Sequence, residues 1–170
     1  MNRLQLATLL SWAGDDGVPG RKRLQKVVFF LQHAGCPLDC HFTLHHFGPY
    51  SCDVADLCDE MVAAGLIEED DGPETGLKQY KYALKPQTRE MLKQASDERM
   101  TQFQEQGAKL INQKLWSLEL GSTILYFHRQ LEDWNVAMSK ACEFKNVGVE
   151  SEQSREALSL AQLFSSAIAN

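Results

Sequence analysis

The sequence predicts a mainly α protein with a winged helix-turn-helix-like head and a C-terminal helical extension. Three amphipathic helical segments come first, and a segment that predicts a small two-stranded β-hairpin follows them. From Pro86 onward the apolar spacing is helical. We therefore expect a head over residues 1–85 and an extension, packed on it, over residues 86–170. This order of elements predicts a topology and says little about a ligand.

The first two helices are expected to flank a Gly-Asp-Asp-Gly turn. Residues 2–13 form the first helix, because leucines recur on one of its sides. Pro19 suits the first turn of the second helix, which ends before Gly35. The buried face of this second helix is predicted to consist of Leu24, Val27, Val28, Leu31 and Ala34.

The opposite side of the second helix carries the densest positive charge in the sequence. One interpretation is a solvated face whose cations pair with carboxylates of the following helix. The other is a contact surface for an acidic partner or a nucleic-acid backbone. An aromatic residue on such a face, here Phe29, either packs under another segment or anchors a partner. We predict that the partner-binding residues are Arg21, Lys22, Lys26, Phe29 and Tyr50.

A Gly-Pro motif after the second helix predicts a rigid corner. Short extended structure is expected over residues 42–47, and Gly48-Pro49 is expected to end it. The hydroxyl of Ser51 is expected to cap the helix that follows. We assign a structural role to His46, Gly48, Pro49 and Ser51, with His46 buried and hydrogen-bonded.

The third helix and the wing complete the predicted head. The helix is expected over residues 51–64, because it carries an unbroken apolar stripe from Val54 to Val62 and stops at Gly65. A strand from residue 66, a turn at 70–73 and a return strand over 77–84 make the hairpin. The outward side of the third helix is acidic, with Asp53, Asp56, Asp59 and Glu60. Carboxylates at a recognition-helix position repel phosphates, which disfavours conventional DNA reading.

Four helices are predicted in the extension, over residues 86–106, 108–131, 133–144 and 152–168. Pro86 suits the first turn of the first of them, and Gly107 is expected to break the chain after it. The second helix is the most apolar, so it should be buried on several sides. Gly121-Ser122 in this helix should let a neighbouring segment approach closely.

Composition narrows the classes of function. The net charge is −6, and residues 1–85 hold 8 Lys and Arg against 12 Asp and Glu. Neither half is basic, which argues against a large phosphate-binding face. No apolar run approaches the roughly 18 residues that a membrane helix needs. The five cysteines, odd in number, are expected to be reduced thiols in a cytoplasmic protein.

The chemistry-bearing side chains concentrate in one loop, from Cys36 to His46. Its two cysteines and three histidines could ligate zinc, but they lack two well-separated ligand pairs. A Cys–His nucleophilic pair is conceivable there, although nothing fixes a base against a nucleophile. No glycine-rich phosphate loop is present. We therefore predict no enzyme, no catalytic residue, no metal and no cofactor.

Three segments resemble the YwgA-like bacterial proteins: GRKRLQKVVFFLQ at 20–32, HFGPYS at 46–51 and AGLI at 64–67. The chain is more distantly similar to the Panacea domain of SocA-type antitoxins, which has a Lys-Leu-Gln-Lys helix and a Gly-Pro-type turn. The resemblance implies a winged-helix-like head with a helical extension. The Panacea relatives act as antitoxins or adaptors that bind other proteins, beside toxin or phage-defence genes. The resemblance implies no catalytic residues.

These observations favour a non-enzymatic, cytoplasmic protein-interaction module. Its expected role is that of an antitoxin-like adaptor or a phage-defence accessory subunit, with a toxin or a defence-complex subunit as its partner and no membrane association. One alternative is a winged-helix DNA-binding regulator that uses the basic helix. A second alternative is a metal-binding protein that uses the loop from Cys36 to His46. A homodimer and an exchange of the C-terminal helices between chains stay open.

Overall fold

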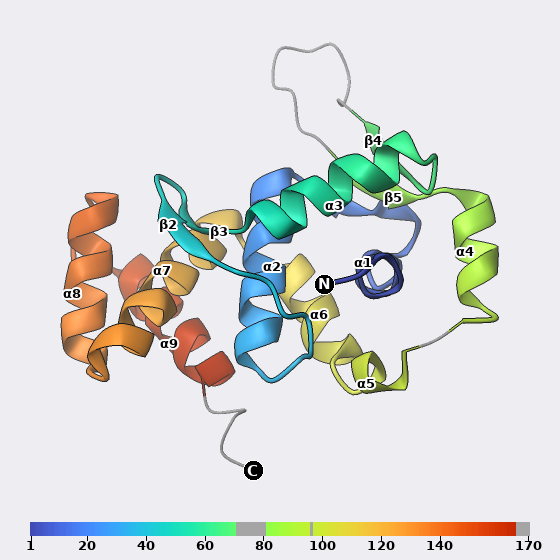
Figure 1. The fold of residues 1–170 in the computed structure, drawn as a ribbon. Helices are drawn as coiled ribbons and strands as arrows, with labels where there is room; N and C mark the ends of the chain where they lie inside the picture. Colours follow the sequence, from blue (N-terminus) through green and yellow to red (C-terminus); the bar gives the residue numbers. More distant parts are fainter. Residues whose placement is uncertain (71–80, 96, 166–170) are drawn as a thin grey trace.

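The computed structural model describes residues 1–70, 81–95 and 97–165, and this part of the chain is mainly helical with two small antiparallel sheets (Figure 1). The prediction of a mainly α protein is confirmed. Helices α1 (Arg3–Ser11), α2 (Arg21–His33) and α3 (Cys52–Ala63) appear where the sequence predicts them. A short 3-10 turn (Gly14–Asp16) separates the first two.

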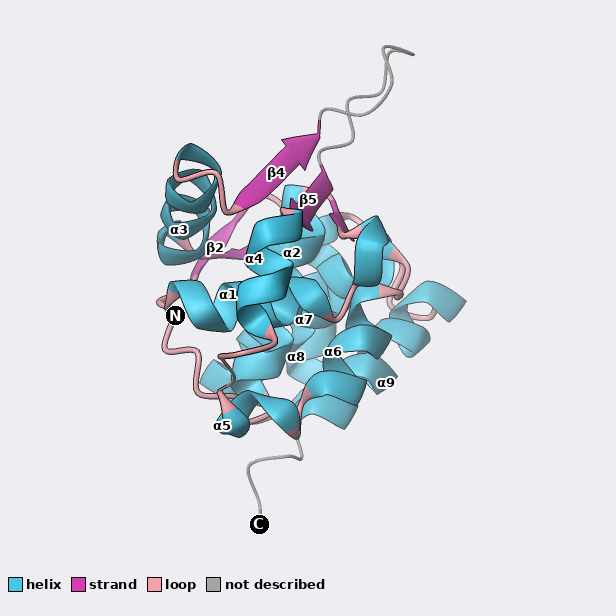
Figure 2. Ribbon diagram, turned by 90° about the vertical axis from the view of Figure 1, so that its right-hand side faces the viewer, coloured by secondary structure: helices cyan, strands magenta, loops and turns pink. Residues whose placement is uncertain are grey.

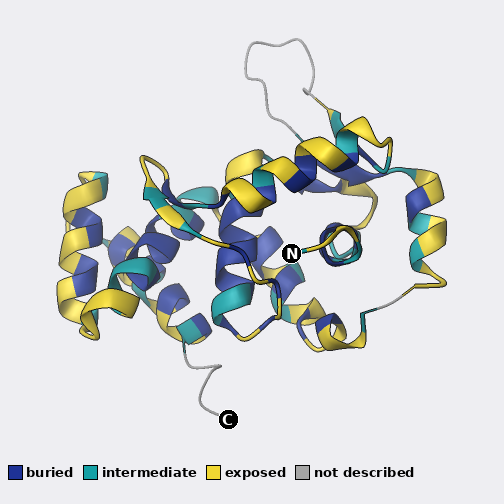
Figure 3. Ribbon diagram, viewed as in Figure 1, coloured by how far each residue is buried: buried dark blue, intermediate teal, exposed yellow. Residues whose placement is uncertain are grey.

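Helix α2 is the central element of the molecule. It begins at Arg21, after Gly20 at the N-cap position, and its middle turns are completely buried: Val27, Val28, Phe30 and Leu31 are 0% exposed. The helix packs against β1 and β3 and against three helices of the C-terminal half, α6, α7 and α9. Figure 3 shows its buried residues between the two halves of the structure. The predicted head and extension therefore share one core.

The first sheet has three strands, in the order β1 (Val18–Pro19), β5 (Lys81–Leu84) and β4 (Ile67–Asp70). The hairpin prediction lacked the first of these, because Pro19 was assigned to a helix. Pro19 instead pairs with Lys81 at the sheet edge, where a residue without an N–H is tolerated. Figure 2 shows this sheet above the helices, with α3 beside β4. The predicted turn at 70–73 and the start of the return strand lie almost entirely outside the described residues.

The second sheet is a hairpin of β2 (Thr43–His45) and β3 (Gly48–Tyr50). Gly48 and Pro49 were expected to end regular structure, but they pair with His45 and Leu44. Gly48 has φ +93°, and a Cβ there would lie 2.6 Å from Thr123 Oγ1. Glycine is required at this position because the hairpin rests directly on helix α7 (Leu115–Leu131).

The predicted helix over residues 86–106 is wrong. Three shorter helices occupy this region and the residues after it: α4 (Pro86–Leu92), α5 (Glu98–Thr101) and α6 (Gln104–Ile111). Pro86 does begin a helix, as expected. Gly107 lies inside α6 and does not break the chain. A side chain at this position would overlap the Trp12 ring, so the contact between α6 and Trp12 requires a glycine.

The rest of the extension consists of α7, α8 (Trp134–Lys145) and α9 (Glu152–Ser165). The close approach predicted at Gly121 is confirmed, since a Cβ there would lie 3.0 Å from the Ala157 carbonyl oxygen and 3.3 Å from Phe30. Phe30 also packs against Phe164, with ring centroids 5.3 Å apart. Within the described ranges, no helix has the length and apolarity to cross a membrane.

Candidate functional site

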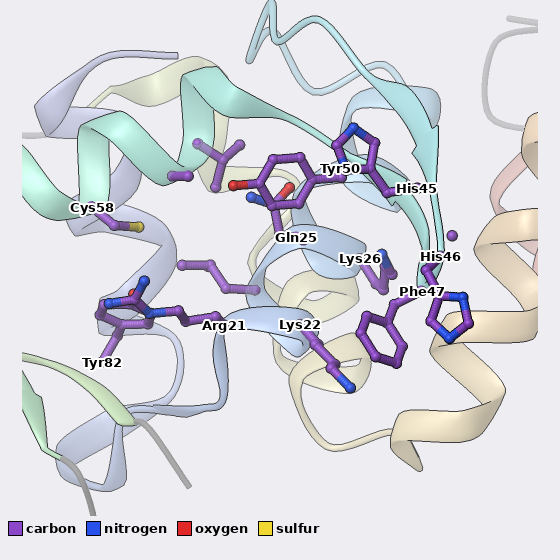
Figure 4. Close-up of a pocket in the computed structure, with 14 residues that line it drawn as sticks. Arg21, Lys22, Gln25, Lys26, His45, His46, Phe47, Tyr50, Cys58 and Tyr82 are labelled. Carbon is purple, nitrogen blue, oxygen red and sulfur yellow. The ribbon is translucent and has the colours of Figure 1, made fainter. Parts of the chain in front are cut away.

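A cavity of about 370 Å³ lies between the start of α2, the β2–β3 hairpin, α3 and β5 (Figure 4). Four of the five predicted partner-binding residues line it: Arg21, Lys22, Lys26 and Tyr50. None of its described lining residues is a carboxylate, although the protein carries a net charge of −6. The cavity therefore has a positively charged lining, in a protein whose overall charge is negative.

Phe29, the fifth predicted residue, does not belong to this site. It is 1% exposed and lies one turn beyond the cavity along α2. Its ring packs edge-on against Phe42, at 5.1 Å between centroids, and lies 4.1 Å from His33. Tyr126 of α7 approaches within 6.5 Å. Of the two interpretations of this aromatic residue, packing under other segments of the same chain is the one that the structure shows.

Lys26 is inside the protein and not on an exposed contact face. It is 2% exposed, and its Nζ donates a hydrogen bond of 2.6 Å to the Pro49 carbonyl oxygen. Burial lowers the pKa of Lys26 to about 8, with the nearby charge of Glu119 opposing this shift. The positive charges of Lys145 and Lys22 lower the pKa further. The Gly-Pro motif thus supplies the carbonyl that holds a buried ammonium group.

Arg21 and Lys22 differ in how their charges are satisfied. The Arg21 guanidinium donates to both carboxylate oxygens of Glu69, at 2.6 and 2.7 Å, and lies 3.8 Å from Asp59 of α3. The hydrogen bond to Glu69 raises the pKa of Arg21. Lys22 is exposed and places its Nζ 3.2 Å from the centroid of the Phe47 ring. The interpretation of cations paired with carboxylates therefore describes Arg21.

A rim of aromatic and basic side chains lies beside the cavity, and we define it by the exposed Lys22, Phe47 and Phe144 and the largely buried Lys145. Phe47 is 44% exposed and Phe144 is 41% exposed. Lys145 Nζ lies 5.9 Å from the Phe47 centroid and 5.7 Å from the Phe144 centroid. The sequence reasoning missed Phe47, Phe144 and Lys145 as site residues. Phe144 and Lys145 are adjacent in the sequence, but Phe47 stands between His46 and Gly48, and no periodicity relates residue 47 to residue 144.

The hairpin turn is fastened by backbone contacts. His46 was expected to be buried, but its side chain is exposed and its carbonyl oxygen accepts a hydrogen bond of 3.2 Å from Lys145 Nζ. Lys145 also lies 3.8 Å from Glu119. The C-terminal half of the chain therefore holds the tip of the hairpin beside the cavity.

Gln25 joins α2 to the start of α3. Its Nε2 donates to the Ser51 carbonyl, and its Oε1 accepts from the Ser51 N–H, each at 2.9 Å. Ser51 occupies the N-cap position, but its hydroxyl makes no capping bond, contrary to the prediction. Among the described side chains it is a buried hydroxyl without a hydrogen-bond partner. The backbone of Ser51, and not its side chain, is what the motif uses.

The sulfur and imidazole groups do not form a reactive arrangement in the described part of the chain. Cys58 lines the cavity, but burial raises the pKa of its thiol to about 12. His45 stacks on Tyr50, with centroids 4.8 Å apart. In the loop considered for zinc, Cys36 Sγ contacts Met100 Sδ at 3.5 Å. No three potential ligands among His, Cys, Asp and Glu come together in the described ranges.

Comparison with known proteins identifies a bacterial relative. The chain is 30% identical over 122 residues to a protein of Bacillus subtilis (strain 168) that is called uncharacterized protein YwgA. The match spans 71% of this chain and 73% of YwgA. No family model matches the chain.

Proposed function

The chain belongs to the family of the bacterial protein YwgA, and on this premise we propose that it is a non-enzymatic protein-interaction module of the bacterial cytoplasm. In this proposal α1 to α3 and the β4–β5 hairpin act as a winged-helix-like head, braced by the C-terminal helices. The role is that of an antitoxin-like adaptor or of an accessory subunit in phage defence. The partner is another protein, either a toxin or a defence-complex subunit.

The observation that carries the proposal is the rim. Two exposed phenylalanines, Phe47 and Phe144, flank the ammonium group of Lys145, and Lys22 lies over the first ring. Aromatic side chains are enriched in protein interfaces because their rings bury a large apolar area, and complementary charges beside them help to select the partner. We infer that the partner presents an acidic segment with at least one apolar side chain.

The surface of α3 supports a protein partner over DNA. Asp53, Asp56, Asp59 and Glu60 are all exposed on this helix. Two of them have basic neighbours, since Glu60 pairs with Arg3 and Asp59 lies near Arg21. The helix still presents carboxylates where a DNA-reading helix would present donors to bases and phosphates.

Affinity capture from the native host tests this function. Tagged wild-type protein is compared with Lys22→Glu and with the double variant Phe47→Ala/Phe144→Ala, and captured proteins are quantified by mass spectrometry. One stoichiometric protein should be retained by the wild type and reduced at least tenfold by both rim variants. Charge reversal and truncation act on different parts of the rim, so a shared loss locates the interface there.

Matched controls make the result specific. Lys109→Glu reverses an exposed lysine on α6, and Leu163→Ala truncates an apolar side chain on α9 that is 69% exposed. Both controls should capture the same partner in wild-type amounts. Equal retention by the rim variants would remove the rim from the interface. Nucleic acid as the stoichiometric component, in place of a protein, would favour the DNA-binding alternative.

A further inference from the structure

We propose that the cavity behind the rim binds a small organic anion with a flat apolar body, of the aromatic carboxylate class. The rim is an exposed surface that suits a protein, whereas the cavity reaches beneath the hairpin to side chains that are almost completely buried. The proposal goes beyond the interaction module above, because it concerns a separate small-molecule ligand.

One end of the cavity is mainly apolar, although the guanidinium of Arg21, which is bound to Glu69, also lies there. Helix α3 contributes Val54, Ala55 and the inert thiol of Cys58, α2 contributes Leu24, and β5 contributes the ring of Tyr82. Figure 4 shows Cys58 and Tyr82 together at this end. The volume of about 370 Å³ lies within the range of small-molecule sites, which is about 300–1,000 Å³. A flat ring system can displace water from these walls without leaving a polar group unsatisfied.

The other end is cationic. Lys22 lies beside Phe47 at the opposite side of the view in Figure 4, and Lys26 lies behind it in the interior. Within the described ranges, neither ammonium group forms an ion pair with a carboxylate. Lys26 has three N–H donors, and its hydrogen bond to Pro49 uses one of them. Glu119 offsets part of the Lys26 charge without forming an ion pair with it, so a bound anion would lower the cost of this buried ammonium group further.

Tyr50 connects the two ends. His45 stacks on its half-buried ring, and Figure 4 shows its hydroxyl directed toward α3, away from Lys26. The ring offers a face on which an aromatic ligand can stack. The cavity therefore offers apolar and aromatic walls for the flat body of a ligand, and the ammonium groups of Lys22 and Lys26 for its anionic group.

The class of ligand is tested with three probes that share one ring system. Indole-3-acetate carries a carboxylate, indole-3-acetamide is neutral, and tryptamine is cationic. Isothermal titration calorimetry of the full chain at pH 7 should show one site for indole-3-acetate, with at least tenfold weaker binding of the amide and none of the amine. Equal binding of the acid and the amide, or no binding of the acid at millimolar concentration, would overturn the proposal.

Variants locate the site. Lys26→Met removes the buried charge, and Lys22→Met removes the exposed one, which keeps the test valid if the buried substitution impairs folding. Each should weaken indole-3-acetate binding at least tenfold, while Lys109→Met on α6 should leave it unchanged. Wild-type affinity in both cavity variants would contradict the assignment. Tighter binding of a tripeptide that ends in a tryptophan with a free carboxylate would identify a peptide terminus as the occupant and overturn the small-molecule proposal.

The calorimetric titration uses only the full chain and a small-molecule probe, without a partner protein. Loss of the partner in the capture experiment therefore leaves the ligand result standing, and the two proposals fail independently.

Discussion

The two ends of α2 present the same face of one helix to very different surroundings. Around Lys22 and Lys26 the hairpin covers the helix without filling the space below it. A cavity remains there, in which neither lysine forms an ion pair with a carboxylate of the described residues. One turn later Phe29 and His33 are covered by Phe42, which leaves aromatic packing with a small cavity of about 180 Å³ beside it. The difference lies in the covering segments, because a rigid strand pair bridges a space that a bulky side chain fills.

The largest expected effect is at the packed end. Phe29→Ala should lower the free energy of unfolding by about 3–5 kcal/mol, because it removes a fully buried ring and leaves a cavity. Urea denaturation followed by circular dichroism measures this change. Phe144→Ala, at an exposed ring, should cost less than about 1 kcal/mol. Equal costs for the two variants would break the contrast between packed and exposed aromatic residues.

The next largest effect on stability is expected at Gly48, in the hairpin that covers Lys22 and Lys26. Gly48→Ala should cost about 2–4 kcal/mol, because a left-handed backbone conformation and a contact with Thr123 Oγ1 are both strained. Gly14 also has a positive φ, but no atom lies within 4 Å of a Cβ built there. Gly14→Ala should therefore cost about 1 kcal/mol. The difference in unfolding free energy between the two variants isolates the contact between the hairpin and α7.

The buried charge of Lys26 predicts a pH dependence of stability, which tests whether the open end of α2 holds a desolvated cation. The pKa of Lys26 is lowered to about 8 in the folded protein from the ordinary lysine value of 10.5, so the unfolded chain binds more protons between these values. The penalty is fully present below pH 8 and is relieved as the pH rises toward 10.5. Relative to Lys26→Met, the wild type should gain about 2 kcal/mol of stability between pH 7 and pH 10. A constant difference between the two proteins across this range would show that Lys26 is not desolvated.

The smallest effect is expected where α2 meets α3. Ser51→Ala should change the unfolding free energy by less than about 0.5 kcal/mol, because the hydroxyl makes no capping bond. The control is Asn2→Ala, since Asn2 Oδ1 accepts from the Gln5 N–H at 3.0 Å and truly caps α1. That substitution should cost about 1 kcal/mol. A similar loss for Ser51→Ala would indicate a hydrogen bond at the start of α3.

Periodicity predicted the elements well where one segment carries its own signal. The leucines of α1, the apolar stripe of α3 and the small-residue contact at Gly121 all reappear in the structure. The predictions were wrong where a distant segment decides the outcome. Pro19 joins a strand only because β5 lies beside it. Gly107 is a glycine because the helix that contains it packs against the distant Trp12 ring, and not because the chain breaks there.

The same distinction between local signals and distant contacts applies to the residues of the site. Four of its residues were predicted, because they fall on one face of α2 or in the Gly-Pro motif. The burial of Lys26 and Phe29 was not predictable, since a helical wheel assigns a face but does not show what covers it. Phe144 and Lys145 come from the far end of the chain, and only the folded structure brings them to the hairpin.

The hydrogen bond from Lys145 to the His46 carbonyl joins residues that are 99 positions apart in the sequence. Contacts of such long range close large loops. Closing a large loop costs conformational entropy, which slows the formation of these contacts. During synthesis, residue 145 leaves the ribosome well after the hairpin has been made. The rim can therefore be completed only after α8 has been made, and a chain truncated before α8 would carry Lys22 and Phe47 but lack Phe144 and Lys145.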